Sequence, residues 1–76
     1  MADITVYVEW KLPQRPRKAV SLTIPANTQV KDFLQRTVPE IDPNEILVII
    51  DGRSVRMDAF IPSGCKIVVL PVLCGG

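Results

Sequence analysis

The chain of 76 residues contains no histidine. Histidine is the only side chain whose ordinary pKa allows it to change charge near neutral pH, and it is the usual base for serine and cysteine nucleophiles. It is also a common zinc ligand. Its absence excludes Ser–His and Cys–His pairs and all His-ligated zinc sites. We therefore expect no bound metal, no bound cofactor and no enzyme that acts by itself.

Cysteine is scarce as well, because only Cys65 and Cys74 are present. Two thiolates are too few for a structural zinc site. The two residues lie on one extended segment, so their Cα atoms are about 30 Å apart, whereas a disulfide needs about 5.5 Å. Unless the end of the chain folds back, we expect free thiols, as a reducing compartment would keep them. Cys65 is expected at a turn or a strand edge.

Excess charge and long apolar runs are also missing. Nine cationic and eight anionic side chains leave a net charge of +1, which gives no strong attraction for nucleic acid or an anionic membrane. The longest apolar runs, at residues 46–50 and 67–73, are far shorter than the roughly 20 residues of a membrane span. Residues 1–3 lead directly into a strand pattern, without the basic and apolar regions of a leader. We expect a cytoplasmic protein with no nucleic-acid or membrane partner.

The hydrophobic share of 47% is typical of one compact domain. Two segments alternate between apolar and polar residues and are predicted as the strands of an antiparallel hairpin. Their apolar positions are Ile4, Val6 and Val8 in the first, and Val20, Leu22 and Ile24 in the second. Residues 11–18 between them form a polar loop with two prolines and four cations. These cations could contact a phosphate or an acidic partner, but without interleaved aromatic residues we favour a solvated turn.

A helix is predicted after the hairpin, with Thr28 or Asn27 as its N-cap. Its apolar positions recur with helical spacing at Val30, Phe33, Leu34 and Val38. Pro39 disfavours helical geometry at the residue before it and so ends the helix. These apolar side chains are expected to form the core.

The remaining elements are strands and turns. Residues 46–50 are predicted as a strand that ends at the tight turn Asp51-Gly52, followed by a short return strand at residues 53–56. Residues 57–61 fit either a short helical turn or an irregular link, with Phe60 or Ile61 in the core. After a turn at residues 62–64, residues 66–72 form a final strand. Both of its faces are apolar, which favours a central position in the sheet.

This order of elements predicts an α+β protein with the β-grasp architecture, a mixed sheet of four to five strands wrapped around one helix. Residues 1–72 would form the domain, and residues 73–76 a flexible C-terminal tail, Leu73-Cys74-Gly75-Gly76. Pro71 disfavours a helix before the tail. The two glycines lack a Cβ atom, so the tip could enter a channel too narrow for other residues.

Two segments resemble a known family. Residues 62–76 consist of a glycine turn, an apolar strand, a proline, a short spacer and Gly-Gly. This pattern is similar to the ending of the small sulfur carriers of the MoaD/ThiS family, the small subunit of molybdopterin synthase and the thiamine-pathway carrier. Ubiquitin-related modifiers are close kin, so the implied fold is ubiquitin-like. Residues 49–55 resemble the strand and Asp-Gly turn of the family, whereas Val72 stands where the family often has a second proline.

The resemblance implies a carrier function for the C-terminus. An E1-like enzyme would use ATP and magnesium to adenylate the carboxylate of Gly76, and a persulfide donor would convert it into a thiocarboxylate. A downstream enzyme would then take the sulfur for molybdopterin, thiamine or tRNA thiolation. Leu73, Cys74 and Gly75 would be presented to the partner together with Gly76.

The partner-binding surface is expected on the sheet face opposite the helix. The resemblance places Tyr7 and Leu70 there, and Val68 would share this face; alternatively, these residues only cover the sheet. Cys74 could exchange acyl or sulfur groups with its neighbour, or have no role. The activated Gly76 could instead be joined to target-protein lysines, as in a ubiquitin-like modifier. A third alternative is a non-covalent binding module.

Overall fold

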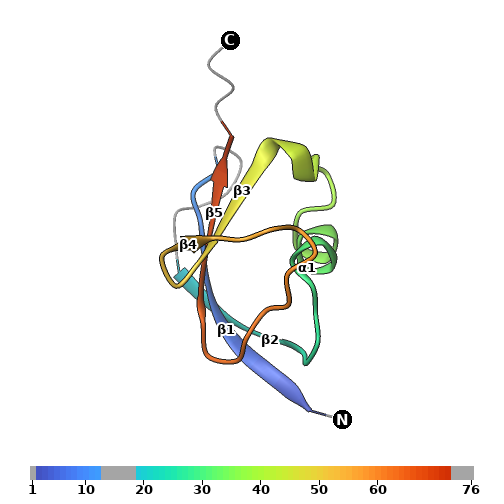
Figure 1. Ribbon diagram of the computed structural model, residues 1–76, viewed down its shortest axis with the longest axis vertical. Helices are drawn as coiled ribbons and strands as arrows, with labels where there is room; N and C mark the ends of the chain where they lie inside the picture. The colour runs from blue at the N-terminus through green and yellow to red at the C-terminus, as the bar shows by residue number, and fades with distance from the viewer. Residues whose placement is uncertain (1, 13–18, 73–76) are drawn as a thin grey trace.

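The computed structural model describes residues 2–12 and 19–72. In this part of the chain, five strands form one sheet in the order β2-β1-β5-β3-β4. A single α-helix covers one face of the sheet (Figure 1). This arrangement confirms the predicted β-grasp architecture. The elements are β1 (Asp3–Trp10), β2 (Ala19–Pro25), α1 (Val30–Thr37), the 3-10 helix η1 (Pro43–Glu45), β3 (Ile46–Ile50), β4 (Arg53–Ser54) and β5 (Lys66–Pro71).

The last strand, β5, occupies the centre of the sheet, as predicted. It pairs in parallel with β1, where Val8 lies opposite Ile67. It pairs antiparallel with β3, where Val48 lies opposite Val69. Ile67 and Val69 have no exposed surface and point toward the helix side. The first and last strands are therefore neighbours, and the N-terminal half cannot complete its sheet without the C-terminal strand.

The predicted hairpin is formed by β1 and β2, which pair antiparallel from Asp3 opposite Pro25 to Glu9 opposite Ala19. Its buried face extends further than predicted, because Trp10 and Leu12 are also buried. Leu12 belongs to the segment predicted as a polar loop, yet its side chain is part of the core. Residues 13–18, the rest of that loop, lie outside the described residues.

The helix packs on the sheet through the predicted apolar face. Val30, Phe33, Leu34 and Val38 are all buried. The Phe33 ring stacks on the Trp10 ring, with centroids 5.9 Å apart and planes 3° from parallel. The N–H of Val38 donates to the carbonyl of Leu34, and the helix ends before Pro39 as expected.

The predicted N-cap is wrong. Gln29 occupies the N-cap position and makes no side-chain capping bond. The hydroxyl of Thr28 instead donates to the carbonyl of Pro25, 2.6 Å away. The first helical N–H groups are satisfied by backbone from a distant segment: Val30 N–H donates to the carbonyl of Ala59 and Lys31 N–H to that of Met57. Tertiary contacts replace the local cap, which the neighbouring sequence could not reveal.

The turn and link predictions are largely confirmed. Asp51 and Gly52 both have positive φ values, 51° and 84°, as a type I′ hairpin turn between β3 and β4 requires. The return strand is shorter than expected, because β4 contains only two residues. Of the two candidates for the core, Ile61 is buried, while Phe60 is 62% exposed.

The two phenylalanines give a matched test of the core. Replacing Phe33 with alanine is expected to lower the free energy of unfolding by about 3–5 kcal/mol, because a cavity opens beside Trp10. Replacing the exposed Phe60 should change it by less than about 0.5 kcal/mol. Urea unfolding followed by the fluorescence of Trp10 measures both. Equal losses in the two variants would contradict the described packing.

Candidate functional site

The C-terminal end of β5 is held in place by a backbone hydrogen bond. The N–H of Val72 donates to the carbonyl of Glu45, 2.8 Å away, at the end of η1. Just before it, Pro71 lies opposite Ile46 of β3. Val72 is thus fixed next to the start of β3, at the end of the sheet where β5 finishes (Figure 1).

The four residues after Val72 lie outside the described residues. They are Leu73, Cys74, Gly75 and Gly76, so the flexible tail and the domain boundary at residue 72 stay predictions. Covalent geometry alone limits their reach, since four residues span at most about 14 Å. Any partner that acts on Gly76 must therefore come close to the end of β5.

Tyr7, Val68 and Leu70 lie on one face of the sheet, the face turned away from α1. Tyr7 alternates with the fully buried Val6 and Val8, and its side chain is 51% exposed. Val68 and Leu70 alternate with the buried Ile67 and Val69 and are half-buried. Because successive side chains of a strand point to opposite faces, all three predicted surface residues share the outer face. Whether a partner binds them stays a prediction.

The strand register divides these three residues into two groups. On β5 and β3, Leu70 lies opposite Leu47 and Val68 lies opposite Ile49. Tyr7 lies opposite Lys66, four residues before Leu70, which corresponds to about 13 Å along the strand. We call the four aliphatic residues the outer patch: Leu47, Ile49, Val68 and Leu70.

The outer patch adjoins a pair of opposite charges on the β1 side. Glu9 lies opposite Val68 in the register of β1 and β5. The ammonium group of Lys11 is 3.6 Å from the Glu9 carboxylate. An apolar centre with charged residues beside it is the usual composition of a protein-binding surface.

Leu47 and Ile49 are members of the patch that the sequence analysis missed. Residues 46–50 are all aliphatic, so the pattern contains no polar positions to mark the outer face. In the structure the strand does alternate: Ile46, Val48 and Ile50 are buried, whereas Leu47 is 39% exposed. The alternation follows from the pairing with β5. One signal in the sequence could have revealed them. The predicted central position of β5 requires a paired strand on each side, and the outer-facing residues of that neighbour would lie beside Val68 and Leu70.

Cys65 lies between the turn at Ser63–Gly64 and the first residue of β5, as predicted, and its side chain is buried in the core, with 2% of its surface exposed. It forms no disulfide. Burial raises the pKa of its thiol, and the nearby Asp51 carboxylate raises it further. A buried, protonated thiol is a poor nucleophile. Cys65 therefore has the properties of a core residue, and any thiol chemistry of the chain would depend on Cys74, outside the described residues.

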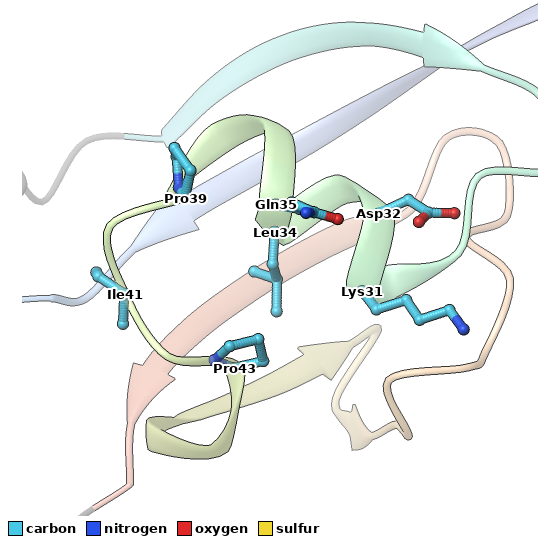
Figure 2. A pocket seen from close by; sticks show the side chains of 7 residues that line it. All are labelled: Lys31, Asp32, Leu34, Gln35, Pro39, Ile41 and Pro43. Carbon is cyan, nitrogen blue, oxygen red and sulfur yellow. The ribbon is translucent and has the colours of Figure 1, made fainter.

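A shallow pocket of about 490 Å³ lies on the other side of the molecule, between α1 and the segment that leads to η1. Figure 2 shows Leu34 pointing from the helix toward Pro43, while Lys31 and Asp32 lie at the start of the helix. The lining combines apolar residues with one cation and one anion. It holds no group of three metal-binding side chains, and none occurs elsewhere in residues 2–12 and 19–72. The lining contains no residue of the outer patch, while Pro43 belongs to η1, whose Glu45 carbonyl holds Val72.

No helix among the described residues is long and apolar enough to cross a bilayer. This finding agrees with the short apolar runs of the sequence.

The strand order, with β5 at the centre, and the single α-helix of the described residues define a ubiquitin-like β-grasp fold. Solved structures similar to this chain include the ubiquitin of Caldiarchaeum subterraneum, with a TM-score of 0.70 and 13% identity over 99% of this chain and 100% of that chain. Another is SAMP1 from Haloferax volcanii, with a TM-score of 0.67 and 15% identity over 95% and 99% of the two chains.

A third similar structure is the ubiquitin-like domain of an Arabidopsis thaliana protein, with a TM-score of 0.66 and 16% identity over 93% of this chain and 79% of that chain. No protein-family model and no curated protein matches the sequence. At these identities the similarity establishes the fold, and the function has to be inferred from the site.

Val72 allows a test of how the end of β5 is held. Proline at this position has no N–H, so V72P is expected to lose the bond to Glu45 and about 1 kcal/mol of unfolding free energy. V72A keeps the N–H and removes only a partly exposed side chain, so its loss should be below about 0.5 kcal/mol. Urea unfolding compares the two, and hydrogen exchange at Leu47, which lies opposite Leu70 next to the lost bond, should accelerate in V72P alone. Identical behaviour of the two variants would show that the bond contributes nothing.

The raised pKa of Cys65 predicts a specific pH dependence. The unfolded thiol ionises near 9.0, whereas the folded thiol stays protonated to higher pH. Its contribution to stability is complete below pH 9 and is lost as the pH rises from there toward the folded pKa. The free energy of unfolding should fall by up to about 1.4 kcal/mol more per pH unit than in C65A. C74A is the control and should keep the steep dependence; parallel curves for the intact protein and C65A would contradict this account.

Proposed function

We propose that this chain is a sulfur carrier whose C-terminal carboxylate at Gly76 is adenylated by an E1-like enzyme and converted into a thiocarboxylate. The observation that carries the proposal is the course of β5. This central strand supplies half of the outer patch and ends at Pro71, directly before the hydrogen-bonded Val72. Gly-Gly follows Val72 after two residues. Half of the proposed recognition surface and the proposed reacting end therefore belong to one continuous segment, residues 66–76.

The chemistry requires a partner. A free carboxylate has a pKa near 3.5 and is an anion at neutral pH, so it resists nucleophilic attack. ATP with magnesium, bound by the E1-like partner, would convert it into an acyl-adenylate and release pyrophosphate. The sulfur of a persulfide donor would then displace AMP, and a thiol would cleave the resulting acyl disulfide to leave the thiocarboxylate. The chain itself supplies the carboxylate, and all bound cofactors belong to the partner.

The domain contributes positioning. The tail can reach about 14 Å beyond Val72, so binding of the outer patch to a partner would confine Gly76 to a small volume. Holding a reactant close to its site lowers the entropy that must be lost when the two reacting groups meet. Leu47 and Leu70 lie next to this end of the sheet and are therefore the best-placed contacts for the activating enzyme.

A second candidate function is conjugation to lysine. The similarity to solved structures named as ubiquitin and SAMP1 supports this alternative, because this chain shares their fold. Activation at Gly76 would be identical, and only the acceptor would differ: a lysine amine in place of a sulfur donor. The two functions therefore share one test for activation and need separate tests for transfer.

Intact mass spectrometry tests the carrier. The protein isolated from its own cells is analysed first, to establish that Gly76 is the mature end. With an E1-like enzyme, ATP, magnesium and a persulfide donor, the C-terminal peptide should then gain about 16 Da, because sulfur replaces one oxygen. A variant without Gly75 and Gly76 should stay unchanged.

Two results would decide against the carrier. An unchanged mass of this protein would overturn the carrier function, provided that a parallel control reaction converts another carrier with its own enzymes. Gly76 found joined to lysines in cell extracts would favour the modifier.

The outer patch gives a second test of the proposal. L70E places a charge in the patch and should lower kcat/KM for adenylation by about 10–100-fold, as expected when an interface anchor is lost. T23E is the matched control, since Thr23 is exposed on the same face of the sheet but lies on β2, away from the patch. Pyrophosphate release measures activation, and thermal unfolding confirms that both variants fold. Equal activity of L70E and T23E would exclude the patch as the docking surface.

A further inference from the structure

The outer edge of the sheet at β2 is open in the part of the chain that the structure describes. β2 pairs with β1 on one side, and it is the terminal strand of the sheet order. Figure 2 shows β2 beyond β1, at the margin of the sheet. An open strand edge presents backbone groups that can pair with another strand.

The hydrogen-bond pattern identifies which groups face outward. Ala26 N–H donates to the carbonyl of Ala2, so even-numbered residues of β2 bond to β1. In an antiparallel pair, alternate residues turn their N–H and C=O groups to the other side. Ala19, Ser21 and Thr23 therefore direct their backbone groups outward. The carbonyl of Pro25 already accepts the hydroxyl of Thr28.

β2 has few of the features that usually protect such an edge. Natural edge strands are blocked by charged side chains, bulges or prolines. Residues 19–25 contain no charged residue, the register with β1 continues without a bulge, and the one proline is at the end of the strand. The strand is thus able to accept a partner along most of its length.

The helix side of β2 is also incompletely covered. Val6 and Val8 of β1 are fully buried, but Val20, opposite Val8, is 39% exposed. Leu22 and Ile24 are only partly buried against the core. An apolar strip therefore follows the open edge and would be covered by another strand added beside it.

We propose that two copies of this chain associate through their β2 strands, antiparallel about a twofold axis at Ser21. In this register Ala19 of one copy faces Thr23 of the other, and Ser21 faces Ser21. All outward N–H and C=O groups of these three residues then find partners. Val20 of each copy covers Leu22 of the other, and no like charges meet within the paired segment.

This register is the reason for proposing a second copy of the chain as the partner. A twofold interface needs a surface that is complementary to itself, and the alternation of small polar and apolar residues about Ser21 fulfils this condition. Pro25, which cannot donate a hydrogen bond, lies outside the paired segment. The outer patch on β3 and β5, and Val72 directly after β5, lie on the other side of β1, so the dimer leaves them free. The interface is small, and we expect a dissociation constant of roughly 0.1–1 mM.

Sedimentation equilibrium of the isolated protein over a concentration series tests the proposal, without any activating enzyme. The mass should rise from 8.4 kDa toward twice that value. Hydrogen exchange at Ala19, Ser21 and Thr23 should slow as the concentration increases. A constant mass of 8.4 kDa up to several millimolar, or exchange at these amides that does not depend on concentration, would overturn the dimer.

A pair of serine variants locates the interface. S21K would place two lysines directly opposite each other and should weaken association about three- to tenfold, with partial recovery in high salt. S54K makes the same change on the exposed strand at the opposite edge of the sheet and should leave association unchanged. Equal weakening by both variants, or none by S21K, would refute β2 pairing. Neither outcome affects the mass change expected at Gly76.

Discussion

The structure depends on the position of β5 between β1 and β3. One face of this strand supplies Ile67 and Val69 to the core, where they lie fully buried under the helix side of the sheet. The other face supplies Val68 and Leu70 to the outer patch. Because β1 and β3 pair with it on either side, both faces of β5 lie in the middle of the sheet. Central placement therefore fixes where β5 ends and puts the outer patch beside that end.

The link that leads into β5 also holds the start of the helix. The start of α1 is completed by the carbonyls of Met57 and Ala59, which belong to the link before β5. Gln29 adds a side-chain bond to the carbonyl of Asp58. These bonds explain why an irregular segment with an exposed Phe60 has a defined course. The segment satisfies the helix backbone, while Ile61 fills the core beside it.

The sequence was sufficient to predict the fold, because its signals are periodic and local. Alternation in residues 3–9, helical spacing from Val30 to Val38, and Asp51-Gly52 each correspond to the element found. The errors concern features that depend on distant parts of the chain. Thr28 resembles an N-cap, but the helix is capped from residues 57–59. Leu12 occurs among polar residues, yet the core includes it.

The candidate site was predictable to a similar extent. Alternation placed Tyr7, Val68 and Leu70 on one face, but the separation of Tyr7 from Leu70 required the register of β1 on β5. The recruitment of Leu47 and Ile49 required the register of β3, which an all-aliphatic segment does not disclose. The bond from Val72 to Glu45 was equally hidden, since it joins backbone atoms of residues far apart in the chain.

The parallel contact between the first and last strands has a consequence for synthesis. During translation, β1 and β2 emerge long before β5, so the apolar side chains of β1 stay without their central neighbour until nearly the whole domain has left the ribosome. Folding therefore awaits the final segment, in contrast to a helical protein that can form its contacts as it is made. The nascent protein would depend on rapid closure, or on chaperones, to avoid aggregation in that interval.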